Sequence, residues 1–282
     1  MKIPKQKIIV IYHGDCRDGF GGAWAAWKKF GAKAAYLPAR DRFGPPCEIK
    51  NKEVYLIDYT YQPEVVEKLI RENKRVTAID HHFTAEPAVK LTERCSFSLH
   101  HSGAILAWNY FHPGKKSPML LRYVEDYDLW RWRMPHLKEV ILYLDLIPFG
   151  FADWTSIARS LETKTGRAAW IKDGNLLLRQ EKSIVRELLQ GSEQVRFMGR
   201  TVYAVNAPHR FVDDLGHELA LRTNSFGIVW SERAGVIKVS LRAVGSTDIS
   251  GIARKLGGGG HKQSGAFRFS ADKPFPWKRI KK

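Results

Sequence analysis

Near the N-terminus the chain runs Lys7-Ile8-Ile9-Val10-Ile11-Tyr12-His13-Gly14-Asp15, an apolar segment that ends in polar side chains. Its centre is β-branched and continuously apolar, which is typical of a strand buried on both faces of a parallel sheet. We therefore predict a strand over residues 7–12. A helix is predicted over residues 20–30, and Gly31 would end it.

The same alternation of strand and helix continues along the first half of the chain. Residues 54–57 and 75–79 are predicted strands, and a helix that begins at Pro63 and extends to about residue 73 separates them. Further helices are predicted from Ser102 to residue 111 and over residues 119–130. Because strands alternate with helices, residues 1–150 are predicted to form an α/β domain with a parallel sheet.

Beyond residue 150 the pattern changes. Residues 151–193 are predicted to form a helical connector with an amphipathic apolar stripe. Residues 194–270 carry short strands, a predicted turn at Arg233-Ala234-Gly235 and two helical stretches, which indicates a smaller mixed α/β domain. Residues 271–282 are basic and interrupted by prolines, and we expect this tail to be loosely ordered.

The overall composition limits the class of protein. A chain of 282 residues that is 44% hydrophobic can bury a sizeable core, and its formal net charge of +17 favours polyanionic partners such as nucleic acid. Its three cysteines are odd in number and do not occur as closely spaced pairs, so neither a disulfide framework nor a structural zinc site is expected. We find no segment that predicts secretion or a membrane span, and a cytoplasmic location is expected.

Acidic and imidazole side chains follow three of the predicted strands. His13, Asp15 and Asp18 follow the first, Asp58 the second, and Asp80-His81-His82 the third. The carboxyl ends of parallel strands open onto one edge, so these side chains are expected to converge. A lone aspartate there is more often a helix cap, but an Asp-His-His run offers little to a turn. Carboxylates mixed with imidazoles suit manganese or magnesium.

Four segments resemble, in order and approximate spacing, the four motifs of the DHH phosphoesterase superfamily. They are His13-Gly14-Asp15-Cys16-Arg17-Asp18-Gly19-Phe20-Gly21, Ile57-Asp58, Ile79-Asp80-His81-His82 and the later Asp126. Val239-Ser240-Leu241-Arg242 and Gly257-Gly258-Gly259-Gly260-His261 are similar to the C-terminal domain often attached to these enzymes. The resemblance covers most of the chain and implies an active site in the cleft between the two domains.

The resemblance also implies a pair of divalent ions, usually Mn²⁺ with Mg²⁺ as the alternative, that activate water to hydrolyse a phosphate ester. Asp58 would bridge the ions, and the other implied ligands are His13, Asp15, Asp18, His81 and Asp126. Asp80 and His82 would support catalysis, His82 by a hydrogen bond to the phosphate or by protonating the leaving oxygen.

Two positions depart from the family pattern or leave a choice. Many relatives have Asp-x-Asp in the first motif, whereas Cys16 and Arg17 separate the two aspartates here. Asp18 is therefore the favoured ligand, and Asp15 would coordinate one ion or lie outside the ligand set. In the fourth motif Asp126 is ranked above Asp128, which stays an alternative.

The run of four glycines suggests close approach of the backbone to a ligand, because such a run costs conformational entropy. The amides of Gly258, Gly259 and Gly260 would point at a phosphate, with His261 as a further donor and Arg242 as a bidentate clamp. The competing interpretation is a flexible linker after a helix, and the family resemblance favours the phosphate site.

We therefore predict a metal-dependent phosphodiesterase that cleaves short oligonucleotides or the ends of single-stranded nucleic acid. The first alternative is a phosphodiesterase for small or cyclic nucleotides, dinucleotides included, and the second is a nucleic-acid-binding protein without activity. A pyrophosphatase is disfavoured, because a compact anion does not need so basic a protein. One or two of the nine tryptophans could stack bases, but the sequence does not indicate which.

Overall fold

The computed structural model describes residues 4–40, 44–260 and 262–280. They divide into two compact units, residues 1–178 and 179–282, with the boundary inside the long helix α8 (Lys164–Gln190). The first half of α8 and the preceding helix therefore pack with the first unit. None of the described helices is long and apolar enough to cross a membrane.

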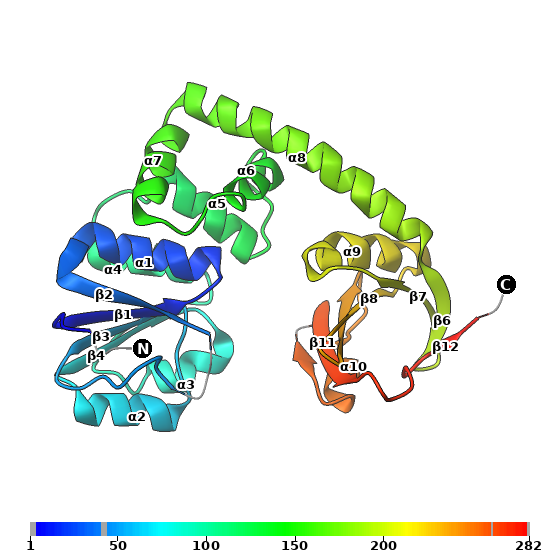
Figure 1. Cartoon of the computed structure of the whole chain (residues 1–282), viewed down its shortest axis with the longest axis horizontal. Coiled ribbons are helices and arrows are strands. Elements are labelled where there is room, and N and C mark those ends of the chain that lie inside the picture. Colours follow the sequence, from blue (N-terminus) through cyan, green and yellow to red (C-terminus); the bar gives the residue numbers. More distant parts are fainter. Residues whose placement is uncertain (1–3, 41–43, 261, 281–282) are drawn as a thin grey trace. The chain divides into compact units, whose positions relative to one another are not determined.

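A five-stranded parallel sheet forms the centre of the first unit (Figure 1). Its strands lie in the order β2 (Ala34–Ala39), β1 (Ile8–His13), β3 (Glu53–Ile57), β4 (Arg75–Asp80) and β5 (Arg94–Phe97). One face is covered by α1 (Arg17–Phe30) and α4 (Gly103–Phe111), and the other by α2 (Pro63–Glu72) and α3 (Glu86–Val89). The predicted α/β class and parallel sheet are confirmed.

Burial on both faces explains why the first strand is continuously apolar. Ile9 and Ile11 pack into the cluster beneath α2, whereas Val10 and Tyr12 pack into the cluster beneath α1 and α4. Strands β2 and β5 were not predicted. β2 contains Pro38, and β5 has only four residues that are exposed or half-buried, so neither carries the apolar signature of a central strand.

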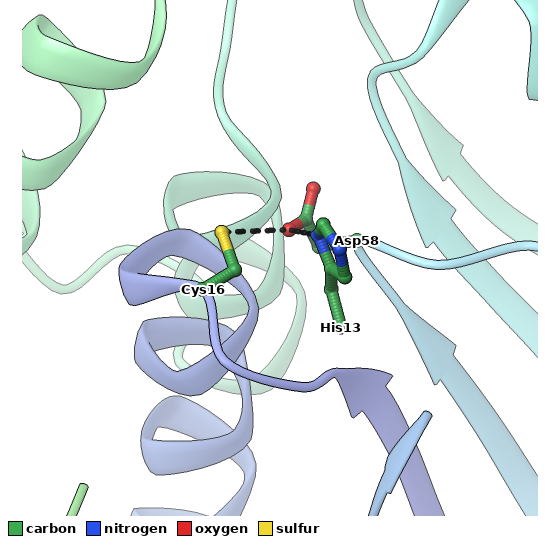
Figure 2. A group of neighbouring side chains, drawn as sticks. All are labelled: His13, Cys16 and Asp58. Atoms are coloured by element: carbon green, nitrogen blue, oxygen red, sulfur yellow. Dashed lines mark hydrogen bonds and ion pairs between the residues drawn. The ribbon is translucent and has the colours of Figure 1, made fainter. Parts of the chain in front are cut away.

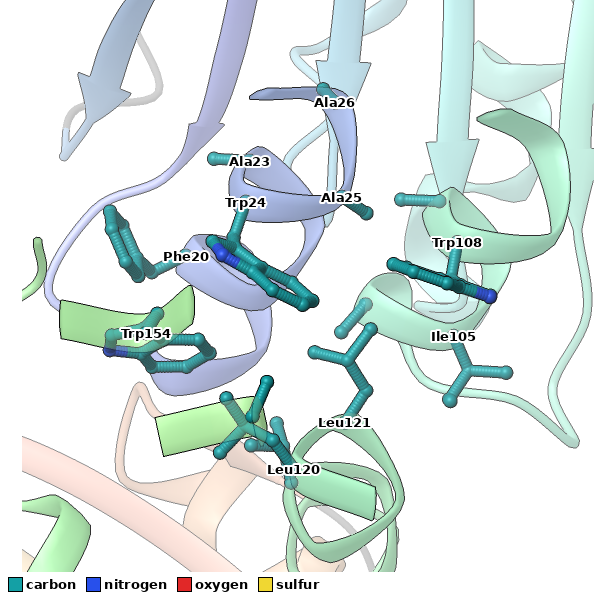
Figure 3. Close-up of a cluster of buried hydrophobic side chains, with 14 of the residues drawn as sticks. Phe20, Ala23, Trp24, Ala25, Ala26, Ile105, Trp108, Leu120, Leu121 and Trp154 are labelled. Atoms are coloured by element: carbon teal, nitrogen blue, oxygen red, sulfur yellow. The ribbon is translucent and has the colours of Figure 1, made fainter. Parts of the chain in front are cut away.

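Aromatic packing fixes the helices on the α1 side of the sheet (Figure 3). Trp24 of α1 stacks on Trp108 of α4 with ring centroids 5.8 Å apart, and Trp154 meets Phe20 edge-on at 4.9 Å. Around this core pack α5 (Met119–Asp128), α6 (Leu137–Leu144) and α7 (Phe151–Glu162). The tight core holds the first turns of α1 and α4 at the edge where the sheet's carboxyl ends emerge.

The second unit is built on a seven-stranded mixed sheet. The strand order is β10 (Gly259–Gly260), β11 (Ser264–Ser270), β9 (Val236–Ala243), β8 (Phe226–Arg233), β7 (Arg200–Asn206), β6 (Glu193–Phe197) and β12 (Lys278–Arg279). β7 and β8 are parallel, and the other pairs are antiparallel. Two helices, α9 (Val212–Thr223) and α10 (Ser250–Lys255), accompany the sheet. This confirms the predicted mixed α/β unit.

The described residues also include three short 3-10 helices, η1 (Gly31–Lys33), η2 (Phe83–Ala85) and η3 (His209–Phe211). The turn predicted at residues 233–235 connects β8 to β9, with φ of 50° at Ala234 and 76° at Gly235. Positive φ at both central positions matches the right-handed twist of a hairpin.

The expectation of a loosely ordered tail is wrong for the described part of residues 271–282. Trp277 is buried, and its ring meets Phe197 edge-on at 5.9 Å. Lys278 and Arg279 then pair with β6 as strand β12. The aromatic residues among the prolines and lysines anchor this segment, and the prediction gave their burial too little weight.

The docking of Trp277 is testable by substitution. Trp277→Ala should lower the free energy of unfolding of the second unit by about 3 to 5 kcal/mol, because it leaves a cavity against Phe197. Leu221→Ala, at a side chain that is 55% exposed, should change it by less than about 0.5 kcal/mol. Urea denaturation followed by circular dichroism checks both, and equal stability of the two variants would mean that the tail is not docked.

Candidate metal centre

The strand register brings the predicted site residues to one edge of the first sheet. Tyr12 on β1 pairs with Ile57 on β3, and Ile57 pairs with Ile79 on β4. The next residues in the three strands are His13, Asp58 and Asp80, so their backbones leave the sheet side by side. The convergence expected from the sequence therefore follows from the parallel register.

Asp58 lies at the middle of this edge and is buried. Its φ of 56° turns the chain away from the sheet directly after β3, and its N–H donates to the carbonyl oxygen of Ile79 over 2.8 Å. One carboxylate oxygen, Oδ2, lies 3.4 Å from His13 Nδ1 and 3.8 Å from Cys16 Sγ (Figure 2). These three residues come from the end of β1, the start of α1 and the end of β3.

The other oxygen of Asp58 faces a different group of side chains. Oδ1 lies 3.1 Å from His81 Nε2 and 3.8 Å from His82 Nδ1. His81 Nε2 in turn lies 3.8 Å from Asp18 Oδ2 and 3.5 Å from Asp128 Oδ2. Asp58 therefore belongs to two groups of potential ligands, one with His13 and Cys16 and one with His81 and His82. His81 also forms a third group with Asp18 and Asp128.

Asp18 is held by the N-terminus of α4. Its two oxygens accept the N–H groups of Gly103, over 2.6 Å, and of Ala104, over 3.0 Å. The free N–H groups and the positive end of the helix dipole stabilise the buried carboxylate. Gly103 permits this approach, because a Cβ there would lie 2.6 Å from Asp58 Cβ and 3.0 Å from Asp18 Oδ2.

The crowding of acidic groups fits a bound cation. Burial and the charge of Asp58 raise the pKa of Asp18 and of Asp128 above their usual range. Burial also acts to raise the pKa of Asp58, but hydrogen bonds from His13 and His81 outweigh it and hold that pKa at about 2. The same burial and carboxylates raise the pKa of the Cys16 thiol. A divalent cation would offset this repulsion, and the donors present suit one.

Asp80 is buried beneath the site and orients His82. Its Oδ1 lies 2.7 Å from His82 Nδ1 and accepts the N–H groups of His81 and His82, while Oδ2 accepts the Thr60 hydroxyl over 2.6 Å. The hydrogen bond to Asp80 raises the pKa of His82. His82 borders a cavity of 330 Å³ that His13, Asp58 and Thr60 also line.

Two of the metal ligands implied by the family resemblance lie elsewhere. Asp15 is 66% exposed with φ of 60°, and it pairs with Arg40 at 2.8 Å instead of joining the group. Asp126 is buried, but its Oδ2 accepts the N–H groups of Arg133 and Met134 over 2.9 Å each. Asp128 lies beside His81 instead. The structure thus brings Asp128 to the group of potential ligands, whereas Asp126 organises the following loop.

Cys16 was missed by sequence reasoning. The cysteine count speaks only to disulfides and structural zinc sites, whereas Cys16 belongs to the group with His13 and Asp58. The available signal was its place, three residues after His13 and two before Asp18, inside the first motif.

The predicted phosphate-binding residues of the second unit have structural partners of their own. Arg242 Nε donates to Asp213 over 2.6 Å. Gly257 and Gly260 have φ of 76° and 144°, and a Cβ on Gly258 would lie 2.0 Å from the carbonyl oxygen of Ala266. Three of the four glycines are thus required by the backbone, and no ligand is needed to explain them. His261 lies outside the described residues.

An exposed aromatic pair follows Asp128. Trp130 and Trp132 are 53% and 43% exposed, and their ring centroids lie 4.9 Å apart at an interplanar angle of 85°. Their φ angles of 54° and 56° are unfavourable for bulky residues. The Asp126 carboxylate and its carbonyl oxygen, which accepts the Arg131 N–H over 2.9 Å, hold this loop. Both rings also contact Tyr127.

Comparison with known proteins supports the fold. No protein-family model matches the chain. An uncharacterized protein of Acanthamoeba polyphaga mimivirus, R106, is 29% identical over 95% of this chain and 69% of its own length. The pGpG-specific phosphodiesterase PggH from Vibrio cholerae is 14% identical, covers 94% of each chain and superposes with a TM-score of 0.54.

A structure of the exonuclease RecJ bound to manganese is also 14% identical and covers 93% of this chain and 86% of its own, with a TM-score of 0.48. The likeness to PggH extends over both units, as the resemblance of the motifs does. The chain therefore has the fold of the DHH phosphoesterases.

Proposed function

We propose that this protein is a metal-dependent phosphodiesterase with two divalent ions at the edge of the first sheet. The observation that carries the proposal is the position of Asp58, whose two oxygens face separate groups of donor atoms. A carboxylate in that position can bridge two cations. His13 and Cys16 would complete one position, and Asp18, His81 and Asp128 the other.

Ions in these positions would acidify a water molecule and neutralise charge on the phosphate oxygens. The surrounding side chains supply the rest of the chemistry. Asp18 and Asp58 are kept in place by α4 and by the strand ends, so the ligand atoms need little rearrangement. Nδ1 of His82 is hydrogen-bonded to Asp80, so Nε2 of the half-exposed ring remains available for the substrate.

His82 is suited to donate a proton. Its hydrogen bond to Asp80 raises the pKa of the imidazole, so the protonated form persists to higher pH than in an isolated histidine. A protonated ring bonded to Asp80 through Nδ1 presents Nε2–H as a donor. We assign to it a hydrogen bond to the phosphate, or transfer of the proton to the leaving oxygen.

The aromatic pair favours a substrate with nucleobases. Trp130 and Trp132 are exposed two and four residues after Asp128, and the loop that presents them is fixed by Asp126 despite its unfavourable backbone angles. Tryptophan faces bind bases of any sequence by stacking. Together with the net charge of +17, the pair supports short oligonucleotides or single-stranded ends as the substrate.

A dinucleotide phosphodiesterase is the second candidate. The observation that favours it is the shared fold with PggH, which is described as specific for pGpG. A base-stacking pair two and four residues after Asp128 would serve a dinucleotide as well as the end of a longer strand, so substrate length decides between the candidates.

Hydrolysis should require a divalent ion and Asp58. The purified chain should cleave labelled RNA or DNA oligomers or pGpG with Mn²⁺, and excess chelator should stop the reaction. Asp58→Ala should abolish hydrolysis while binding of single-stranded oligomers persists, because the basic surface is unchanged. Stepwise release of mononucleotides favours the first candidate, and cleavage of dinucleotides alone favours the second. Binding without any turnover of these substrates or of cyclic dinucleotides would contradict both.

The fourth motif offers a matched pair of variants. Asp128→Asn should lower kcat by on the order of a hundredfold, since its carboxylate lies beside His81 and a weakened metal centre typically loses that much. Asp126→Asn keeps a carbonyl oxygen that can accept the N–H groups of Arg133 and Met134, so its kcat should stay close to that of the parent. Steady-state kinetics at saturating Mn²⁺ compares them, and the opposite order would restore Asp126 as the ligand.

Stacking on the tryptophan pair should appear in substrate binding. Replacing both Trp130 and Trp132 by alanine should lower kcat/KM on pGpG by about tenfold or more, from the loss of base stacking. The corresponding double phenylalanine variant should retain most of it. An analogue of the dinucleotide that lacks both bases supplies the control, because its kcat/KM should be equal for the three proteins. An equal loss on that analogue would assign the pair a structural role.

A further inference from the structure

Cys16 places a sulfur atom among ligands that are otherwise oxygen and nitrogen. It lies directly before α1 with an extended backbone, φ of −125° and ψ of 134°, which directs the thiol toward the end of β3 (Figure 2). Its Sγ lies 3.8 Å from Asp58 Oδ2, and His13 Nδ1 lies 3.4 Å from the same oxygen. All three donor atoms lie within 4.8 Å of one another.

This spacing is that of ligands around one ion. Bonds of about 2.0 Å to nitrogen or oxygen and about 2.3 Å to sulfur in a tetrahedral arrangement put the ligand atoms about 3.5 Å apart. The observed separations from Asp58 Oδ2, 3.4 and 3.8 Å, bracket that value. A small shift of the side chains is enough to hold an ion between them.

A purely structural role explains the cysteine less well. A buried structural cysteine normally packs among apolar side chains, as a small hydrophobic residue. Cys16 instead faces a buried carboxylate across a long, weak S–H contact, with an imidazole beside it. Cys47 packs against the apolar cluster beneath α2, and Cys95 is exposed. Among the described residues, Cys16 is the cysteine that belongs to a group of potential metal ligands.

We propose that Cys16 binds a divalent ion as a thiolate, so that the two ions of the proposed centre have unlike surroundings. This inference rests on the proposed function, and it deepens it. The position next to β1 offers sulfur, nitrogen and one oxygen of Asp58. The position next to β4 offers the second oxygen of Asp58, two further carboxylates and an imidazole. Binding at the first position releases the thiol proton to solvent.

Because the two metal positions have different ligand atoms, they should prefer different metal ions. A thiolate favours softer ions such as Zn²⁺ or Co²⁺, whereas carboxylates favour Mn²⁺ and Mg²⁺. The first position should therefore hold a softer ion while the second holds Mn²⁺ or Mg²⁺. Cys16→Asp should leave both positions with hard oxygen and nitrogen ligands only. The cysteine in the first motif thus determines which metal the centre takes up.

The test uses Co²⁺ as a spectroscopic probe on the full chain freed of metal. The parent protein should develop a near-ultraviolet sulfur-to-cobalt charge-transfer band that saturates at one equivalent per chain. Cys16→Ser and Cys16→Asp should lack the band, and Cys95→Ser should retain it in full. Calorimetric titration should show that Cys16→Asp lowers the affinity for Zn²⁺ relative to Mn²⁺ by about tenfold or more. Thermal melting confirms that each variant is folded.

The outcomes separate this inference from the proposed function. If Co²⁺ binds the parent protein but no charge-transfer band appears, the thiolate is not a ligand and the metal centre stands. A band that persists in Cys16→Ser, or that disappears in Cys95→Ser, overturns the assignment to Cys16. If calorimetry detects no binding of Co²⁺, Zn²⁺ or Mn²⁺ to the parent protein, the inference and the metal centre both fail.

Discussion

The charge of the buried Asp58 carboxylate is the constraint around which the edge of the first sheet is arranged. A carboxylate removed from water needs partners that favour its ionised form. Within the described part of the chain, its ion-pair partners are the imidazoles of His13, His81 and His82. Asp18 is compensated only in part, by two N–H groups at the N-terminus of α4, and its pKa stays raised by burial and by the charge of Asp58. The parallel register and the position of α4 are therefore conditions for burying two acids together.

The convergence of the side chains at this edge can be predicted from the sequence, because the carboxyl ends of parallel strands lie at the same edge of a sheet. The apolar runs ending in His13, Asp58 and Asp80 predict their convergence, and the register confirms it. The sequence does not show which of Asp126 and Asp128 faces the site. Residues two apart on a helix are rotated by about 200° around its axis and lie on nearly opposite faces, so one faces the site and the other does not. Only the rotation of α5, set by its packing on α1, α4 and α7, decides which.

Two local patterns of the sequence have a tertiary explanation in the structure. The glycine run suggested a ligand, yet close packing on β11 and left-handed backbone account for Gly257, Gly258 and Gly260. The prolines and lysines of the tail suggested disorder, yet Trp277 packs against Phe197. In both cases the deciding contact joins segments distant in sequence or in different elements, which composition alone does not reveal.

The edge strands of the second sheet limit its pairing with other molecules. Each border strand is two residues long, the glycines of β10 on one side and Lys278-Arg279 of β12 on the other. A long, flat border strand would leave a row of N–H and C=O groups ready to pair with another molecule. Short borders, one of them made of two cations, leave little backbone for such pairing. The C-terminal segment thus shields β6, a five-residue strand, from edge-to-edge aggregation.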